Sequence, residues 1–263
     1  MCSTDQVASN LVAIEKGMQE AARRGVDLLC LPENAMAMGA TGVLAWAQQA
    51  PEFLHSLQTW AHRYGLWLLA GTLPWPTRPD GQACAAGRVR AASFLIDSEG
   101  QIQARYDKMH LFDVDVVDAV GAYRESDRIE AGERPVVAET PWGRLGLSVC
   151  YDLRFAELYS QLARADVRLI AVPAAFTQRT GEAHWHVLLR ARAIESQVFV
   201  LAPAQAGWHD RERQTYGHSL IVDPWGEVVL DAAEQVGLHV MAIDLDAVDA
   251  RRRAMPMAQQ RRL

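Results

Sequence analysis

Three ionisable side chains stand where apolar segments of the chain stop, and the first is a thiol. Cys150 follows residues 145–149, which have the continuous apolar character of a buried strand, and a helix-like segment begins at Phe155. A strand-to-helix turn lifts a side chain clear of a sheet and aims backbone N–H groups at whatever that side chain attacks. This setting predicts that Cys150 is a nucleophile.

A carboxylate and an ammonium occupy comparable positions. Glu33 comes just after the apolar segment 28–31, and Lys108 comes just after the predicted strand 101–106. Sheet proteins collect their sites where core strands stop. A thiol, a carboxylate and an ammonium supply a nucleophile, a proton shuttle and a charge for an oxyanion, which are the parts that amide hydrolysis needs.

Other combinations of residues weigh less. A free cysteine is often only a small buried hydrophobe. Ser148 makes a near miss to the Gly-x-Ser-x-Gly elbow of serine hydrolases, but it lies inside the strand and would need a histidine base. His110 could pair with Cys150 in a Cys–His hydrolase. His184 and His186 lie two apart on a predicted helix and face different ways, which makes them a poor metal pair.

Composition points to a small-molecule partner. The 263 residues are 50% hydrophobic, and no long polar or Pro-rich linker interrupts them, so we expect one domain over residues 1–263. The formal charge of −6 argues against nucleic acid or an anionic membrane as partner. Neither Gly-x-Gly-x-x-Gly nor a Walker-type motif occurs, and we expect no cofactor and no metal.

The cysteines and the N-terminus predict a cytoplasmic protein. The four cysteines form no Cys-x-x-Cys pair and no zinc-like spacing, which favours a reducing compartment. No signal-peptide pattern follows Met1, and no apolar stretch approaches the roughly 18 residues that a membrane span requires.

Periodicity predicts alternating helices and strands, and hence an α/β protein with a mixed sheet. Helices are expected over residues 7–24, 43–64, 155–163 and 183–196. Strands are expected over 26–31, 66–73, 90–97, 101–106, 145–149, 167–173, 198–203, 218–222, 228–230 and 238–243.

The residues around these elements resemble the nitrilase superfamily of carbon–nitrogen hydrolases, in particular its Nit branch of amidases. The resemblance covers nearly the whole chain and is carried by residues 31–39, 108–115, 123–126, 140–155, 180–185, 189–195 and 216–226. It implies a four-layer α-β-β-α sandwich of two mixed sheets.

The resemblance also implies roles for individual residues. Glu33, Lys108 and Cys150 match the family's catalytic triad, with Glu33 as general base and acid. Lys108 and the backbone N–H of Tyr151 would bind the oxyanion. Glu125, in Tyr-Arg-Glu-Ser, matches a second glutamate that holds Lys108 and orients the substrate; on the residues alone, its neighbours Arg124 and Arg128 could instead pair with it at the surface.

Within the branch, residues 31–39 and 123–126 are most similar to amidases of deaminated glutathione, the α-keto analogue of glutathione. Such a ligand is anionic and needs a basic or amide-rich pocket. Contributions are expected from Arg179, Thr180 and His184, and also from Arg211 and Arg213, whereas Arg154 is interpreted as a brace for the turn after Cys150. An ω-amidase of 2-oxoglutaramate would share every catalytic residue, and a catalytically inactive scaffold is the alternative from another class.

Two further expectations follow from the resemblance. Family members pair subunits through helices that include residues 155–163, so a homodimer is expected, with Phe155, Leu158, Tyr159 and Leu162 able to cover both core and partner. Members also begin with a short apolar strand ending in Gln, and this chain starts where that strand would finish. Either the start is mis-assigned or the strand is lost, which would leave an exposed sheet edge.

Overall fold

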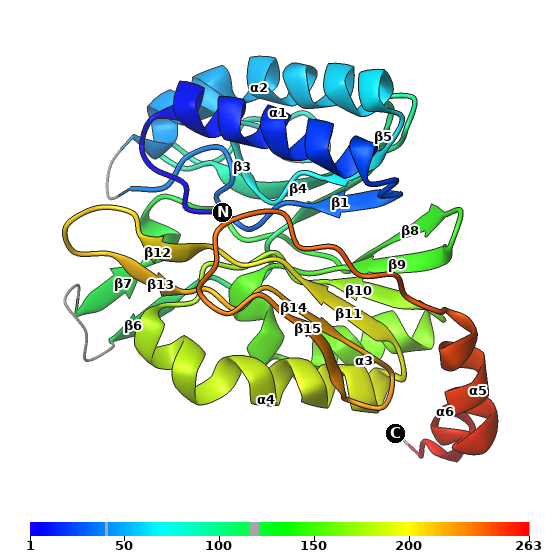
Figure 1. The fold of residues 1–263 in the computed structure, drawn as a ribbon. Helices are drawn as coiled ribbons and strands as arrows, with labels where there is room; N and C mark the ends of the chain where they lie inside the picture. The colour runs from blue at the N-terminus through cyan, green and yellow to red at the C-terminus, as the bar shows by residue number, and fades with distance from the viewer. Residues whose placement is uncertain (40–41, 116–120, 263) are drawn as a thin grey trace.

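Two β-sheets lie face to face with helices on both outer sides (Figure 1). The computed structural model describes residues 1–39, 42–115 and 121–262. Helices α1 (Val7–Arg23) and α2 (Val43–Tyr64) cover the first sheet, and α3 (Ala156–Arg164) and α4 (Gln178–Ser196) cover the second. The expected four-layer α-β-β-α sandwich is confirmed.

The first sheet is mixed and has the order β1-β2-β4-β3, with β5 also paired to β4. β1 and β2 run parallel, and the other pairs are antiparallel. β4 and β5 form the predicted hairpin. The strands are β1 (Leu28–Cys30), β2 (Trp67–Leu69), β3 (Leu73–Trp75), β4 (Arg90–Ile96) and β5 (Ile102–Asp107).

The second sheet is also mixed and has the order β15-β14-β11-β10-β9-β8. Its centre, β9-β10-β11, is parallel, and the outer strands are antiparallel to their neighbours. The strands are β8 (Val136–Thr140), β9 (Gly143–Leu147), β10 (Leu169–Ala171), β11 (Phe199–Ala202), β14 (Leu220–Val222) and β15 (Val228–Asp231). Two small hairpins, β6 (Asp113–Asp115) with β7 (Ala122–Arg124) and β12 (Ala206–Trp208) with β13 (Gln214–Tyr216), lie outside both sheets.

Alternation along β4 explains how one strand serves two apolar layers. Phe94 and Ile96 belong to the core cluster beneath α1 and α2, whereas Leu95 belongs to the cluster that joins the two sheets. Successive strand residues point to opposite faces, so a continuous apolar run is needed wherever both faces are covered. Leu68 and Leu69 of β2 divide in the same way.

Two sequence expectations differ from the structure. The single strand expected over 66–73 is two strands separated at Gly71, whose φ is +68°. A Cβ atom there would collide with the carbonyl oxygen of Pro32, so glycine allows the turn and the close approach of the segment that leads to Glu33. The strand expected over 238–243 is absent from the described chain, and residues 238–243 have no regular structure.

The chain ends in two short helices, α5 (Asp246–Ala254) and α6 (Met257–Gln260). At the other end, the carbonyl of Met1 accepts a hydrogen bond from Ala206 N at 2.9 Å. Across the described ranges, β1 pairs with β2 only. No helix in the described part of the chain combines the length and apolarity of a membrane span.

Candidate active site

The residues predicted to act together follow strands of two different sheets. Glu33 follows β1 and Lys108 follows β5, both in the first sheet, whereas Cys150 follows β9 in the second. All three are buried, at 4%, 2% and 8% exposure. The three groups line one cavity, which lies at the end of the sandwich where these strands stop.

Cys150 has an uncommon backbone conformation. It opens the 3₁₀ helix η2 (Cys150–Arg154) with φ at +48°, and its N–H donates to the carbonyl oxygen of Pro173 at 2.9 Å. A left-handed conformation is rare outside glycine and is held here by the strand before it and the helix after it. The predicted strand-to-helix turn is confirmed.

Lys108 lies between two carboxylates. Its Nζ is 2.7 Å from Glu33 Oε1 and 2.9 and 2.8 Å from the two oxygens of Glu125. Glu125 Oε2 also accepts from the backbone N–H of Phe112 at 2.7 Å. The structure therefore places Glu125 on Lys108, while its neighbour Arg124 binds Asp115.

Burial and these charges set the protonation states. Burial raises the pKa of the Cys150 thiol well above its ordinary value, and the nearby Glu33 carboxylate raises it further, while Lys108 lowers it. Burial alone would lower the pKa of Lys108, but Glu125 and Glu33 raise it well above the usual range. Burial also raises the pKa of Glu125. The resting thiol is thus neutral at pH 7 and needs a base when it attacks.

Asp152 holds the turn that carries Cys150. Its side chain is fully buried and accepts hydrogen bonds from Val149 N at 2.8 Å, from the Tyr106 hydroxyl at 2.7 Å and from His110 N at 3.0 Å. His110 Nδ1 lies 2.7 Å from the same carboxylate, and the ring stacks on Phe155. The His110 ring is thereby engaged by Asp152, which weakens the Cys–His alternative.

We expect Asp152→Asn to lower the free energy of unfolding by about 2–3 kcal/mol, because hydrogen bonds to a charged acceptor are lost and an amide N–H₂ faces donors in a buried site. Urea denaturation measures the change. Asp166→Asn is the matched control, since Asp166 is 77% exposed and should shift stability by no more than about 0.5 kcal/mol. Equal midpoints for the two variants would contradict the assigned role.

Ser148 is not positioned to act as a nucleophile, because its hydroxyl is buried and hydrogen-bonded. Its hydroxyl lies 2.9 Å from the Tyr159 hydroxyl and donates to the carbonyl oxygen of Ala171 at 2.9 Å, and the side chain is buried. The first contact joins the end of β9 to α3, and the second joins it to the neighbouring strand β10. The serine alternative therefore has no geometric support.

The cavity beside Cys150 has a volume of about 670 Å³, and its wall carries four arginines together with the acidic Asp210 and Glu212. Arg124, Arg128, Arg154 and Arg213 all line it. A cavity of this size fits a tripeptide-sized ligand, and several guanidinium groups suit an anionic one. Tyr151, at the first turn of η2 where backbone N–H groups have no intrahelical acceptor, lines it as well.

The residues expected to bind substrate are only partly placed there. Thr180 lines the cavity, but Arg179 and His184 are exposed and do not. His184 Nδ1 instead lies 3.1 Å from Nη1 of Arg154. Sequence spacing could not show this, because which residues of the first turns of α4 face the cavity depends on how the helix is docked.

Arg154 departs from its sequence interpretation, whereas Arg213 agrees with it. Arg154, read from sequence as a brace, lies over the rings of Tyr151 and Phe176 and lines the cavity, where burial lowers its pKa. Arg213 lines the cavity as expected, whereas Arg211 does not. The position of Arg154 four residues after Cys150 could have predicted a basic side chain in the cavity wall, but the sequence interpretation assigned it to bracing the turn.

Comparison with known proteins identifies the family of this chain. The model of the carbon-nitrogen hydrolase family matches residues 1–253. A protein of Yersinia enterocolitica named deaminated glutathione amidase is 40% identical, over 100% of this chain and 91% of its own length. The chain therefore belongs to the carbon–nitrogen hydrolases, enzymes that cleave carbon–nitrogen bonds.

Two solved structures agree with this assignment. The crystal structure of the Caenorhabditis elegans NitFhit protein is 36% identical with a TM-score of 0.90, and the match covers 100% of this chain and 63% of that longer chain. Saccharomyces cerevisiae Nit3, described as a member of branch 10 of the nitrilase superfamily, is 26% identical with a TM-score of 0.85, over 100% of this chain and 93% of its own. The nitrilase resemblance of the sequence is confirmed.

Proposed function

We propose that this protein hydrolyses the amide of deaminated glutathione to 2-oxoglutarate and cysteinylglycine. The observation that carries the proposal is the cluster of the buried Glu33 and Lys108 with the partly buried Glu125, which faces Cys150 in an arginine-lined cavity. The full-length similarity to relatives named deaminated glutathione amidase supports the substrate.

In the first half-reaction, Cys150 Sγ attacks the amide carbon while Glu33 takes the thiol proton. Lys108 and the N–H of Tyr151 stabilise the oxyanion of the tetrahedral intermediate. Glu33 then gives its proton to the amine of cysteinylglycine as the carbon–nitrogen bond breaks. The product of this step is a 2-oxoglutaryl thioester on Cys150.

In the second half-reaction, Glu33 removes a proton from water, which attacks the thioester carbon, and the carbon–sulfur bond breaks to regenerate the thiol. Glu125 acts through Lys108: its two oxygens fix the ammonium in place between the carboxylates. The arginines of the wall bind the carboxylates of the substrate. The reacting amide is neutral and does not compete for these charges.

The decisive experiment is rapid-quench mass spectrometry of the protein mixed with deaminated glutathione. We expect a 2-oxoglutaryl adduct on Cys150, and turnover that exceeds the turnover of 2-oxoglutaramate by the same preparation. Faster turnover of 2-oxoglutaramate would identify an ω-amidase instead, and the absence of both adduct and turnover would point to an inactive scaffold.

Lys108→Met is expected to lower kcat by about 10²–10³-fold, the loss that follows removal of one oxyanion donor. The change should appear in the single-turnover rate of acylation, because Lys108 Nζ lies beside the base and the thiol rather than at the arginine wall. A variant that keeps its maximal rate and only raises KM would make Lys108 an anchor for a substrate carboxylate.

We further propose a cytoplasmic, single-domain homodimer. Of the α3 residues expected to cover both core and partner, Leu158, Tyr159 and Leu162 are buried in the subunit's own core, and Phe155 is half-buried. Support comes from Val187 and Ile194 on α4, which are 68% and 44% exposed and lie seven residues apart on one helical face. Sedimentation at micromolar concentration should give twice the monomer mass, and a monomer alone would refute the dimer.

A further inference from the structure

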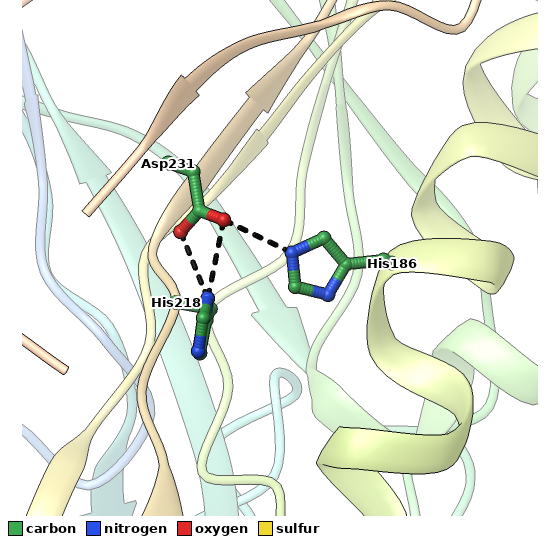
Figure 2. Close-up of side chains that lie close together, drawn as sticks. All are labelled: His186, His218 and Asp231. Atoms are coloured by element: carbon green, nitrogen blue, oxygen red, sulfur yellow. Dashed lines mark hydrogen bonds and ion pairs between the residues drawn. The ribbon is translucent and has the colours of Figure 1, made fainter. Parts of the chain in front are cut away.

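Two histidines and an aspartate that are far apart in sequence converge outside the cavity (Figure 2). His186 projects from α4, His218 precedes β14, and Asp231 ends β15. One ligand atom of each lies within 4.8 Å of the others. The sequence pairing of His184 with His186 missed this group, because its members meet only through the packing of α4 on the second sheet.

The distances suit a metal ion bound between the three side chains. His186 Nε2 is 3.1 Å from Asp231 Oδ2, and His218 Nδ1 is 2.9 and 3.2 Å from the two carboxylate oxygens. Ligand atoms bound tetrahedrally at 2.0–2.1 Å from a zinc ion are about 3.3 Å apart. The histidine-to-aspartate separations are therefore close to those of a coordinated set.

Neighbouring contacts hold His218 in position. Its backbone has a φ of +53°, its carbonyl accepts from Trp185 Nε1 at 2.7 Å, and its ring stacks on Tyr216 with centroids 4.3 Å apart. Asp231 Oδ1 also accepts from Ala233 N at 2.7 Å. Outer contacts of this kind orient metal ligands and raise the affinity of a site.

The charge around the group favours a cation. Asp231 contributes a carboxylate to the group itself, and Glu234 follows it three residues later in the chain. Glu182 also lies one helical turn before His186 on α4. The side chains of His186, His218 and Asp231 are 31%, 20% and 34% exposed, so an ion can enter without unfolding.

We propose that His186, His218 and Asp231 form a binding site for a divalent transition metal of the zinc class. Two imidazoles and one carboxylate suit Zn²⁺, Co²⁺ and Ni²⁺ better than the oxygen-preferring Mg²⁺ and Ca²⁺. None of the three residues lines the cavity at Cys150, so the ion would not take part in amide hydrolysis. It would instead link α4 to β14 and β15 and stabilise the helix layer on the second sheet.

The test is titration of tag-free protein with Co²⁺ and Zn²⁺, followed by visible absorption and by calorimetry. We expect one Co²⁺ per chain with bands of nitrogen and oxygen ligation, and a higher melting temperature with Zn²⁺. His186→Ala and the isosteric Asp231→Asn should each weaken binding by about tenfold or more. His55→Ala, an exposed histidine on α2, is the matched control and should bind as the unsubstituted protein does.

Binding at the reactive thiol is distinguished by its spectrum and by Cys150→Ala. Thiolate ligation of Co²⁺ would add an intense near-ultraviolet band that disappears in that variant, whereas the proposed site is unaffected by it. Unchanged affinity in both His186→Ala and Asp231→Asn would overturn the proposal. Absence of binding to the folded, tag-free protein would reduce the group to a hydrogen-bonded cluster and would also overturn it.

Discussion

Replacing Cys150 with alanine is expected to reduce turnover to background, a loss of about 10⁴-fold or more for a covalent nucleophile. The fold should survive, because the volume change is small and alanine can adopt the left-handed conformation of this position at a modest cost. Steady-state hydrolysis of deaminated glutathione measures the loss, and thermal denaturation checks the fold.

Cys84→Ala is the matched control for that result. Cys84 is a free, partly exposed thiol whose Sγ lies 3.9 Å from the carbonyl oxygen of Trp75, and it does not line the cavity. Its removal should leave the rate unchanged. Residual hydrolysis in Cys150→Ala above the uncatalysed rate would remove Cys150 as the nucleophile.

Glu33→Gln is expected to be nearly as damaging, with kcat lower by about 10²–10⁴-fold. The amide keeps the shape of the side chain and can still accept from Lys108, but it cannot take a proton. A base is needed because burial and the nearby Glu33 carboxylate raise the pKa of the Cys150 thiol well above its ordinary value. The thiol therefore stays protonated through neutral pH.

His110→Ala provides the comparison for Glu33→Gln. His110 is held by Asp152 and Phe155, so its removal should act mainly on the stability of the turn and less on the chemical step. Single-turnover acylation rates at matched folded fractions separate these effects. If His110→Ala slowed acylation more than Glu33→Gln, a Cys–His mechanism would replace the one proposed.

The ends of strands were the most predictable part of the site. Cys150 and Glu33 each follow an apolar run, and such runs can be read from sequence because both faces of the strands are covered. Lys108 follows β5, which is polar and partly exposed at its start and buried only at its end. The hairpin of β4 and β5 was predictable from the turn Ser98-Glu-Gly100, which separates the two predicted strands. The four-layer arrangement came from the family resemblance and not from periodicity.

Features that depend on packing could not be predicted. The apolar segment 66–73 breaks at Gly71 because of a contact with Pro32, which is distant in sequence. Residues 238–243 have an apolar pattern typical of a strand, yet in the structure no described neighbour pairs with them. The direction in which Arg179 and His184 point likewise follows from the docking of α4.

The division of the proposed catalytic residues between two sheets has a consequence for folding. Glu33 and Lys108 leave one sheet and Cys150 leaves the other, so neither half of the sandwich contains a working set of groups. During refolding, hydrolysis should return only when the halves dock, after most helices and strands have formed, because docking requires contacts between distant parts of the chain. Recovery of activity therefore reports the docking of the two sheets, which is the longest-range step of assembly. Selection for activity at high temperature should favour substitutions that strengthen the contact between the sheets.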